Sequence, residues 1–170
     1  MGNLNIEVAY GACSLLCATV GAVYDVTVRR IPNAFTFPAI VFGLLLHFTL
    51  GGWRQLGTAA AAGLCSGLIF PPIYPLATAV GCIAGLSLIQ PLLILTSLAG
   101  GVMAIGLALY HGRLKETMLN VCTLTVHHGT VGLAPHPEFN IDNAQTLRLP
   151  YALAIAAGSA LSLCLLIVQR

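Results

Sequence analysis

One acidic residue, Asp25, is the main candidate for chemistry in this sequence. It lies in a polar stretch, residues 24–33, between two apolar segments, and no other Asp or Glu occurs between Glu7 and Glu116. A carboxylate at the edge of a hydrophobic segment is costly, and in membrane proteins such groups are commonly functional. We therefore expect Asp25 to be catalytic, which requires that a second carboxylate face it.

The composition indicates an integral membrane protein and argues against several other classes. Of the 170 residues, 58% are hydrophobic and only 7% are charged, as is typical of chains that span a membrane. The net charge of +2 is too small to indicate a nucleic-acid partner. The six cysteines contain no CxxC pair, so they predict neither a zinc site nor a disulfide framework. We expect no cofactor and no metal.

The apolar segments predict one all-α domain over residues 1–170, a bundle of about six transmembrane helices. A helix needs about 20 residues, at 1.5 Å per residue, to cross a hydrocarbon core of about 30 Å. The expected spans are Val8–Tyr24, Ala34–Leu50, Leu56–Leu76, Ala77–Gln90, Leu92–Tyr110 and Leu149–Val168.

The ends of these spans are predicted from Gly, Pro and Asn. We expect turns at Gly51–Arg54 and at Gln90–Pro91, because Pro in a helix interior removes a hydrogen bond. Asn33 is expected to cap the second span through its side chain. The glycine pairs Gly63-x3-Gly67 and Gly81-x3-Gly85 are expected to let helices approach closely.

The basic residues predict the orientation of the bundle. No Lys or Arg precedes the first span, which argues against a cleaved signal peptide and for an amino terminus outside the cytoplasm. Arg29 and Arg30 then place the loop after the first span in the cytoplasm. Three crossings between Gln55 and Gly112 put most of the remaining basic residues on the same side, namely Arg113, Lys115 and Arg148.

The join between the third and fourth expected spans does not fit this arrangement well. The chain passes from Leu76 to Ala77 with no polar turn, and the fourth span has only 14 residues (77–90). That length is short for a full crossing. We therefore expect that a polar segment is missing at this point.

Three stretches, Asp25–Asn33, Tyr74–Gly81 and Arg148–Gly158, together resemble a known family. They are similar to the first catalytic motif, the two flanks of the second motif and the last span of the aspartic type IV prepilin peptidases. The likeness is to the short form found in tight-adherence (Flp) pilus systems, and it covers nearly the whole chain. In that family a Gly-x-Gly-Asp segment lies between the two flanks and supplies the second catalytic aspartate. Here Leu76 is followed directly by Ala77.

Two explanations of this difference are open. Either the gene encodes a segment that this chain lacks, or the protein is a natural variant without half of the active site. We favour the first, because the flanks remain in register and the segment would restore a fourth span of normal length. Without the segment we expect the chain to be inactive.

The resemblance implies the chemistry of an aspartic endopeptidase. One carboxylate of the pair takes a proton from the attacking water, while the protonated carboxylate hydrogen-bonds the scissile carbonyl and later protonates the amine. Which role belongs to Asp25 is not determined, because coupled carboxylates titrate as a pair. A simpler interpretation, that Asp25 only marks the membrane boundary, is opposed by the helix dipole, which disfavours an anion at the carboxyl end of a helix.

The implied substrate is a Flp-type prepilin, whose leader would be removed at the cytoplasmic face of the bacterial inner membrane. The implied partners are therefore the prepilin leader with its hydrophobic helix, and the lipid bilayer. In larger relatives methylation depends on an added cytoplasmic domain with paired cysteines. It is not expected here, because only seven residues precede the first span and none of them is a cysteine. The alternative is a non-catalytic helical bundle that binds pilin or pilus-assembly proteins.

Residues 111–148 form the one sizeable extramembrane segment that we expect, on the cytoplasmic side. Four histidines occur there together with Glu116, Glu138 and Asp142, but no spacing matches a metal-binding pattern. Glu116 and Asp142 also lack the motif context that would let them replace the missing aspartate.

Overall fold

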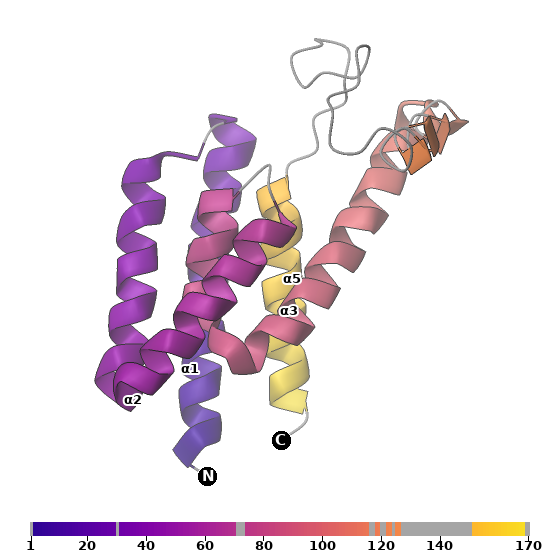
Figure 1. Cartoon of the computed structure of the whole chain (residues 1–170). Coiled ribbons are helices and arrows are strands. Elements are labelled where there is room, and N and C mark those ends of the chain that lie inside the picture. Colours follow the sequence, from indigo (N-terminus) through magenta and orange to yellow (C-terminus); the bar gives the residue numbers. More distant parts are fainter. Residues whose placement is uncertain are drawn as a thin grey trace. The chain divides into compact units, whose positions relative to one another are not determined.

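The computed structural model describes residues 2–29, 31–70, 74–115, 118–119, 122–123, 125–126 and 151–168. Its long elements are all helices: α1 (Gly2–Thr27), α2 (Asn33–Ile69), α3 (Tyr74–Tyr110) and α5 (Tyr151–Val168) (Figure 1). All four are long and apolar enough to cross a membrane. The expected all-α class is therefore confirmed for the described residues. The expected number of six spans is wrong for the part of the chain that the structure describes, where four such helices are found.

The number differs because α2 and α3 each contain two helical segments, which join at a glycine with non-helical backbone where the chain turns sharply (Figure 1). Gly52 has φ 67° and ψ −159°, and Gly85 has φ 72° and ψ 178°. Positive φ is accessible to glycine without the steric cost that a Cβ brings. The bend at Gly52 falls within the predicted turn Gly51–Arg54, whereas the predicted turn at Gln90–Pro91 is wrong. Pro91 lies inside α3, and its φ, fixed near −65°, is compatible with a helix.

The predicted boundaries around Leu76 and Asn33 also need correction. Helix α2 ends at Ile69, and α3 already begins at Tyr74, so the join of Leu76 and Ala77 lies within the first turns of a continuous helix. Asn33 is the first residue of α2 rather than its cap. The preceding residue, Pro32, is extended (φ −70°, ψ 133°) and there is no side-chain cap. Instead, the Pro32 carbonyl accepts hydrogen bonds from the N–H groups of the first turn.

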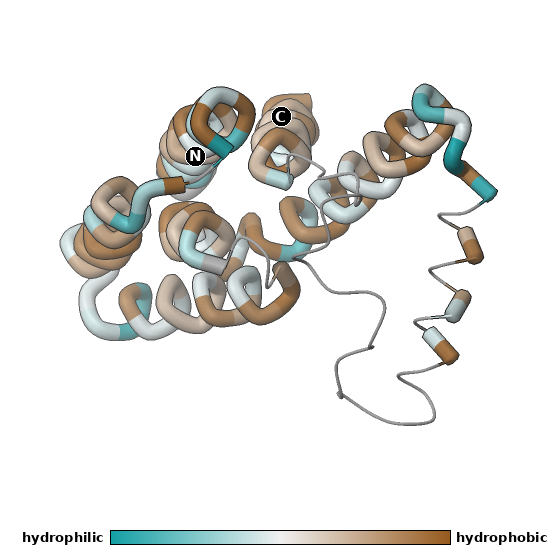
Figure 2. Tube along the Cα trace, turned by 90° about the horizontal axis from the view of Figure 1, so that it is seen from above, coloured by the Kyte–Doolittle hydropathy of each residue, from teal (hydrophilic) through white to brown (hydrophobic). Residues whose placement is uncertain are grey.

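The distribution of side chains is that of a protein in lipid. Alanine, serine and threonine are frequent among the buried residues, whereas large residues such as Leu16, Leu68 and Leu98 are mostly exposed. Figure 2 shows hydrophobic positions around most of each helix rather than along one stripe. A helix that is apolar on all sides is buried in a large core or in a membrane. These helices therefore indicate a membrane protein.

The chain divides into two compact units, residues 1–100 with 150–170, and residues 101–149. In the first unit α1 packs against α5, and a core of small and aliphatic residues joins α1, α3 and α5. This core includes Ala18, Ala22, Leu76, Val80 and Ile155. The second unit contains the last residues of α3, from Gly101 to Tyr110.

Helices α2 and α3 approach closely at glycines, as predicted for Gly63 and Gly81. A Cβ at Gly63 would collide with Cys82, and one at Gly81 would collide with Ser66 and would lie 2.8 Å from the Ala62 carbonyl oxygen. The Ser66 hydroxyl also donates a hydrogen bond of 2.6 Å to the Ala77 carbonyl. Small residues and hydroxyl hydrogen bonds are the usual means of helix association in membranes.

Candidate functional site

Asp25 lies two residues before the end of α1, and its side chain is half-buried. Its Oδ2 atom accepts a hydrogen bond of 3.0 Å from the backbone N–H of Ala152. Ala152 is the second residue of α5, and the first four N–H groups of a helix have no acceptor within that helix. Asp25 therefore caps α5 from a neighbouring helix.

This contact changes the electrostatic argument about Asp25. An anion at the carboxyl end of α1 is unfavourable with respect to that helix, but the amino end of α5 carries a partial positive charge. The carboxylate lies where α5 stabilises it. Asp25 thus has a structural role that the sequence analysis did not foresee, because its partner is 127 residues away in the sequence.

The position at which we expected the second carboxylate lies near this end of α1. Leu76 packs on Gly21, where a Cβ would lie 2.6 Å from Leu76 Cδ1. Gly21 is one helical turn before Asp25, or about 6 Å along the axis at 1.5 Å per residue. The Leu76–Ala77 join and Asp25 therefore belong to the same region of the bundle.

Among the residues that the structure describes, the one other acid is Glu7. It lies 18 residues before Asp25 on α1, which corresponds to about 27 Å of helix. Glu7 cannot pair with Asp25 across that distance. Glu116, Glu138 and Asp142 lie outside the described residues.

The connection after α1 begins with a left-handed residue. Val28 N–H still bonds to the Tyr24 carbonyl at 2.9 Å, and Arg29 then has φ 54°. A residue in this conformation commonly ends a helix. The Tyr24 ring lies 6.1 Å from that of Phe35 in α2, so an aromatic contact links the two helices beside Asp25.

No group of three or more His, Cys, Asp or Glu residues gathers within the described part of the chain. Of the histidines in the segment 111–148, only His111 is described. Its Nδ1 lies 2.9 Å from the Leu107 carbonyl oxygen of its own helix. His127, His128 and His136 lie outside the described residues.

A second set of polar residues, which the sequence analysis missed, surrounds His47 in α2. This side chain is only 2% exposed, and it lies within the apolar segment that we assigned to the second span. An ionisable residue in such a segment is itself a signal of function. That signal was available in the sequence.

Comparisons with protein families, with curated proteins and with solved structures found no match for this chain. The described residues indicate the class of the chain by themselves: four long helices suited to a membrane, with a carboxylate held where the end of α1 meets the start of α5. The likeness to prepilin peptidases remains a prediction from the sequence.

Proposed function

We propose that this chain is the helical framework of an aspartic prepilin leader peptidase. Asp25 would supply one carboxylate of the catalytic pair, and a segment between Leu76 and Ala77 would supply the other. The contact that carries the proposal is that of Leu76 with Gly21. Because of it, a loop inserted after Leu76 would start about one helical turn from Asp25.

In this mechanism the paired carboxylates hold a water molecule against the scissile peptide bond. The water oxygen bonds to the carbonyl carbon, one carboxylate takes the water proton, and the other donates a proton to the departing amine. The Ala152 N–H fixes the orientation of the Asp25 carboxylate. Fixed orientation matters because a catalytic group must lie within hydrogen-bond reach of the proton it moves.

The proposed orientation places Asp25 at the cytoplasmic face of the bacterial inner membrane. Arg29 lies two residues after the end of α1, and basic loops remain in the cytoplasm. A prepilin leader, which is short and basic in this family, would meet the site there. The hydrophobic helix of the prepilin would lie in the bilayer beside the bundle.

The test is to complete the site. A Gly-x-Gly-Asp segment is inserted between Leu76 and Ala77, and cleavage of a Flp-type prepilin is followed in membranes by the change in its size. We expect cleavage with the insertion and none without it. Asp25→Asn in the completed chain should abolish cleavage, as should the same insertion with Asn in place of its Asp.

Two results would contradict the proposal. One is cleavage by the chain in which Leu76 directly precedes Ala77, because a single carboxylate would then suffice. The other is a completed chain that inserts into membranes with α5 in place yet cleaves no prepilin.

A non-catalytic bundle that binds pilin is the second candidate. The observation that favours it is the bond from Ala152 to Asp25, which accounts for the carboxylate without catalysis. Under this alternative, the uncompleted chain should co-purify with a prepilin from membranes. Asp25→Asn, whose amide oxygen can still accept that bond, should leave co-purification unchanged.

A further inference from the structure

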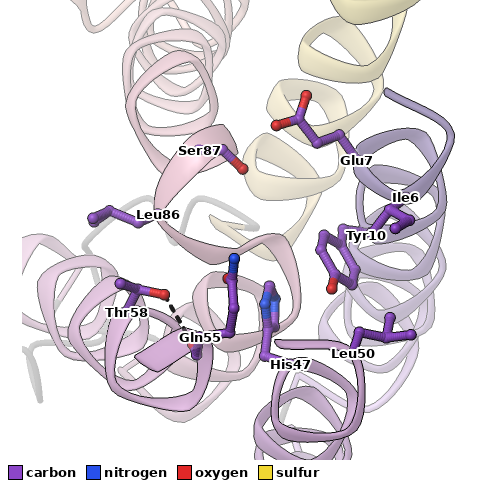
Figure 3. Close-up of a pocket in the computed structure, with 9 residues that line it drawn as sticks. All are labelled: Ile6, Glu7, Tyr10, His47, Leu50, Gln55, Thr58, Leu86 and Ser87. Atoms are coloured by element: carbon purple, nitrogen blue, oxygen red, sulfur yellow. Dashed lines mark hydrogen bonds between the residues drawn. The ribbon is translucent and has the colours of Figure 1, made fainter. Parts of the chain in front are cut away.

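A polar pocket lies at the opposite end of α1 from Asp25 (Figure 3). Its volume is about 330 Å³, and it is formed within the first compact unit by α1, α2 and α3. Two thirds of the residues that line it are polar, which is unusual in a chain of this composition. They are Glu7, Tyr10, His47, Gln55, Thr58 and Ser87.

The bend of α3 creates one wall of this pocket. The break at Gly85 interrupts the hydrogen-bond ladder of the helix, so carbonyls of the preceding turn need other donors. His47 Nε2 lies 3.2 Å from the Ile83 carbonyl oxygen. The imidazole occupies the space that a side chain at position 85 would need, since a Cβ there would lie 2.5 Å from His47 Cε1.

The contact with Ile83 assigns the proton of the His47 ring. A carbonyl oxygen can only accept, so Nε2 carries the hydrogen and Nδ1 of the neutral ring is an acceptor. Nδ1 is buried and has no hydrogen-bond partner among the described residues. One face of the ring is covered by Tyr10, with the ring centroids 4.1 Å apart. A buried acceptor without a donor indicates that something else supplies one.

The other groups of the pocket define the chemistry of that donor. Figure 3 shows the Glu7 carboxylate, the Ser87 hydroxyl, the Gln55 amide and the His47 ring facing a common space. The Thr58 hydroxyl donates to the backbone carbonyl of Gln55 at 2.8 Å. The hydroxyl oxygen can therefore still accept a hydrogen bond from a ligand, but its proton is already used. Glu7 is the one charged side chain of this pocket. Glu7 would repel an anion. A metal ion is also a poor fit, because His47 and Glu7 are the only histidine and acidic residues among the described residues that line the pocket.

We propose that this pocket binds a primary ammonium group. Its N–H donors would bond to His47 Nδ1 and to the Glu7 carboxylate, and its charge would be balanced by Glu7. This site is independent of the proposed peptidase activity, because it shares no residue with the region around Asp25.

The residues next to the pocket point to two sources for the ammonium group. Leu50 and Gln55 line it on either side of the bend at Gly52. In that bend Trp53 is 78% exposed and contacts Phe48 edge to face. Exposed tryptophan is enriched at the membrane interface, where ethanolamine headgroups lie. The group therefore comes from a lipid headgroup or from a soluble alkylamine.

The test uses the purified full chain in a non-ionic detergent and isothermal titration calorimetry. n-Butylammonium should bind saturably. Tetramethylammonium, which has the charge but no N–H donor, should bind with an affinity at least about tenfold lower. Glu7→Gln should lower the affinity for n-butylammonium by about tenfold or more, and Ser87→Ala should lower it by less. Asp25→Asn, which removes the other carboxylate of α1, should leave this affinity unchanged.

Lipid nanodiscs then distinguish the two sources. If phosphatidylethanolamine in a phosphatidylcholine bilayer competes with n-butylammonium, the ligand is the lipid headgroup; if it does not compete, the ligand is a soluble amine. Equal binding of the two ammonium ions, or full affinity in Glu7→Gln, would overturn the proposal. Absence of any n-butylammonium binding by a folded chain in detergent would also overturn it.

Discussion

Asp25 shows how one residue can have a structural and a chemical role at the same atom. Its carboxylate caps α5 through Ala152, and the same carboxylate is the proposed catalytic group. The two roles need different chemistry. A cap requires only an oxygen that accepts a hydrogen bond, whereas the peptidase mechanism requires a group that ionises.

Substitutions at Asp25 should therefore separate stability from activity. Asp25→Ala removes the cap and should lower the free energy of unfolding by about 1 kcal/mol, whereas Asp25→Asn should lower it by less. Both should abolish cleavage in the completed chain. Thermal unfolding in detergent measures the first effect, and prepilin cleavage measures the second.

Equal unfolding temperatures of the two variants would contradict the capping role of Asp25. A suitable control is Thr19→Val on the same helix. The Thr19 hydroxyl donates only to the Leu15 carbonyl of its own helix, and the side chain is exposed.

At the scale of the element, glycines decide where α2 and α3 bend. Gly52 and Gly85 both have positive φ, but their surroundings differ. A Cβ at Gly52 would meet nothing within 4 Å, whereas one at Gly85 would meet His47. The first bend thus depends on backbone conformation alone, and the second also on packing.

Alanine substitutions should reproduce this difference. Gly52→Ala should cost about 1–2 kcal/mol of stability from the left-handed backbone. Gly85→Ala should have the same backbone cost and a further loss of about 1–3 kcal/mol, because the methyl group displaces His47. Gly101→Ala, in a helical and open position of α3, should be neutral or stabilising by up to about 1 kcal/mol. Equal losses at Gly52 and Gly85 would show that His47 does not pack as described.

The helix contact at Gly81 offers a second test at this scale. Gly81→Ala would press on Ser66 and on the Ala62 carbonyl, and we expect a loss of about 1–3 kcal/mol. Gly57→Ala is the matched control, because nothing lies within 4 Å of a Cβ there. Thermal unfolding in detergent compares the two. A loss at Gly57 as large as that at Gly81 would contradict close packing of α2 on α3.

For the whole molecule, the proposed orientation can be tested by labelling. In a background with all six cysteines replaced, Trp53→Cys and Val28→Cys place single thiols at exposed positions near opposite ends of the first helical segment of α2, which ends at the kink at Gly52. With the amino terminus outside, a membrane-impermeant maleimide should label position 53 in intact cells. Position 28 should be labelled only after permeabilisation. The reverse pattern would place Asp25 outside and contradict the peptidase proposal.

The sequence predicted the local features that depend on residue type alone. Long apolar segments, the bend at Gly52 and the close approach at Gly63 and Gly81 were all foreseen. The second bend was placed at Pro91 instead of Gly85, because proline is a general helix breaker but only the fold shows which residue has positive φ. Asp25 was singled out as unusual, but its hydrogen bond with Ala152 was not foreseen.

By itself, then, the sequence determined that this is an all-α chain suited to a membrane. The reason is that the free energy of transferring side chains into lipid adds up residue by residue along each segment. Tertiary structure decided which distant groups meet. It brought the start of α5 to Asp25, Leu76 to Gly21 and His47 to the break in α3. These contacts depend on how small residues let helices pack, and neither composition nor periodicity specifies that packing.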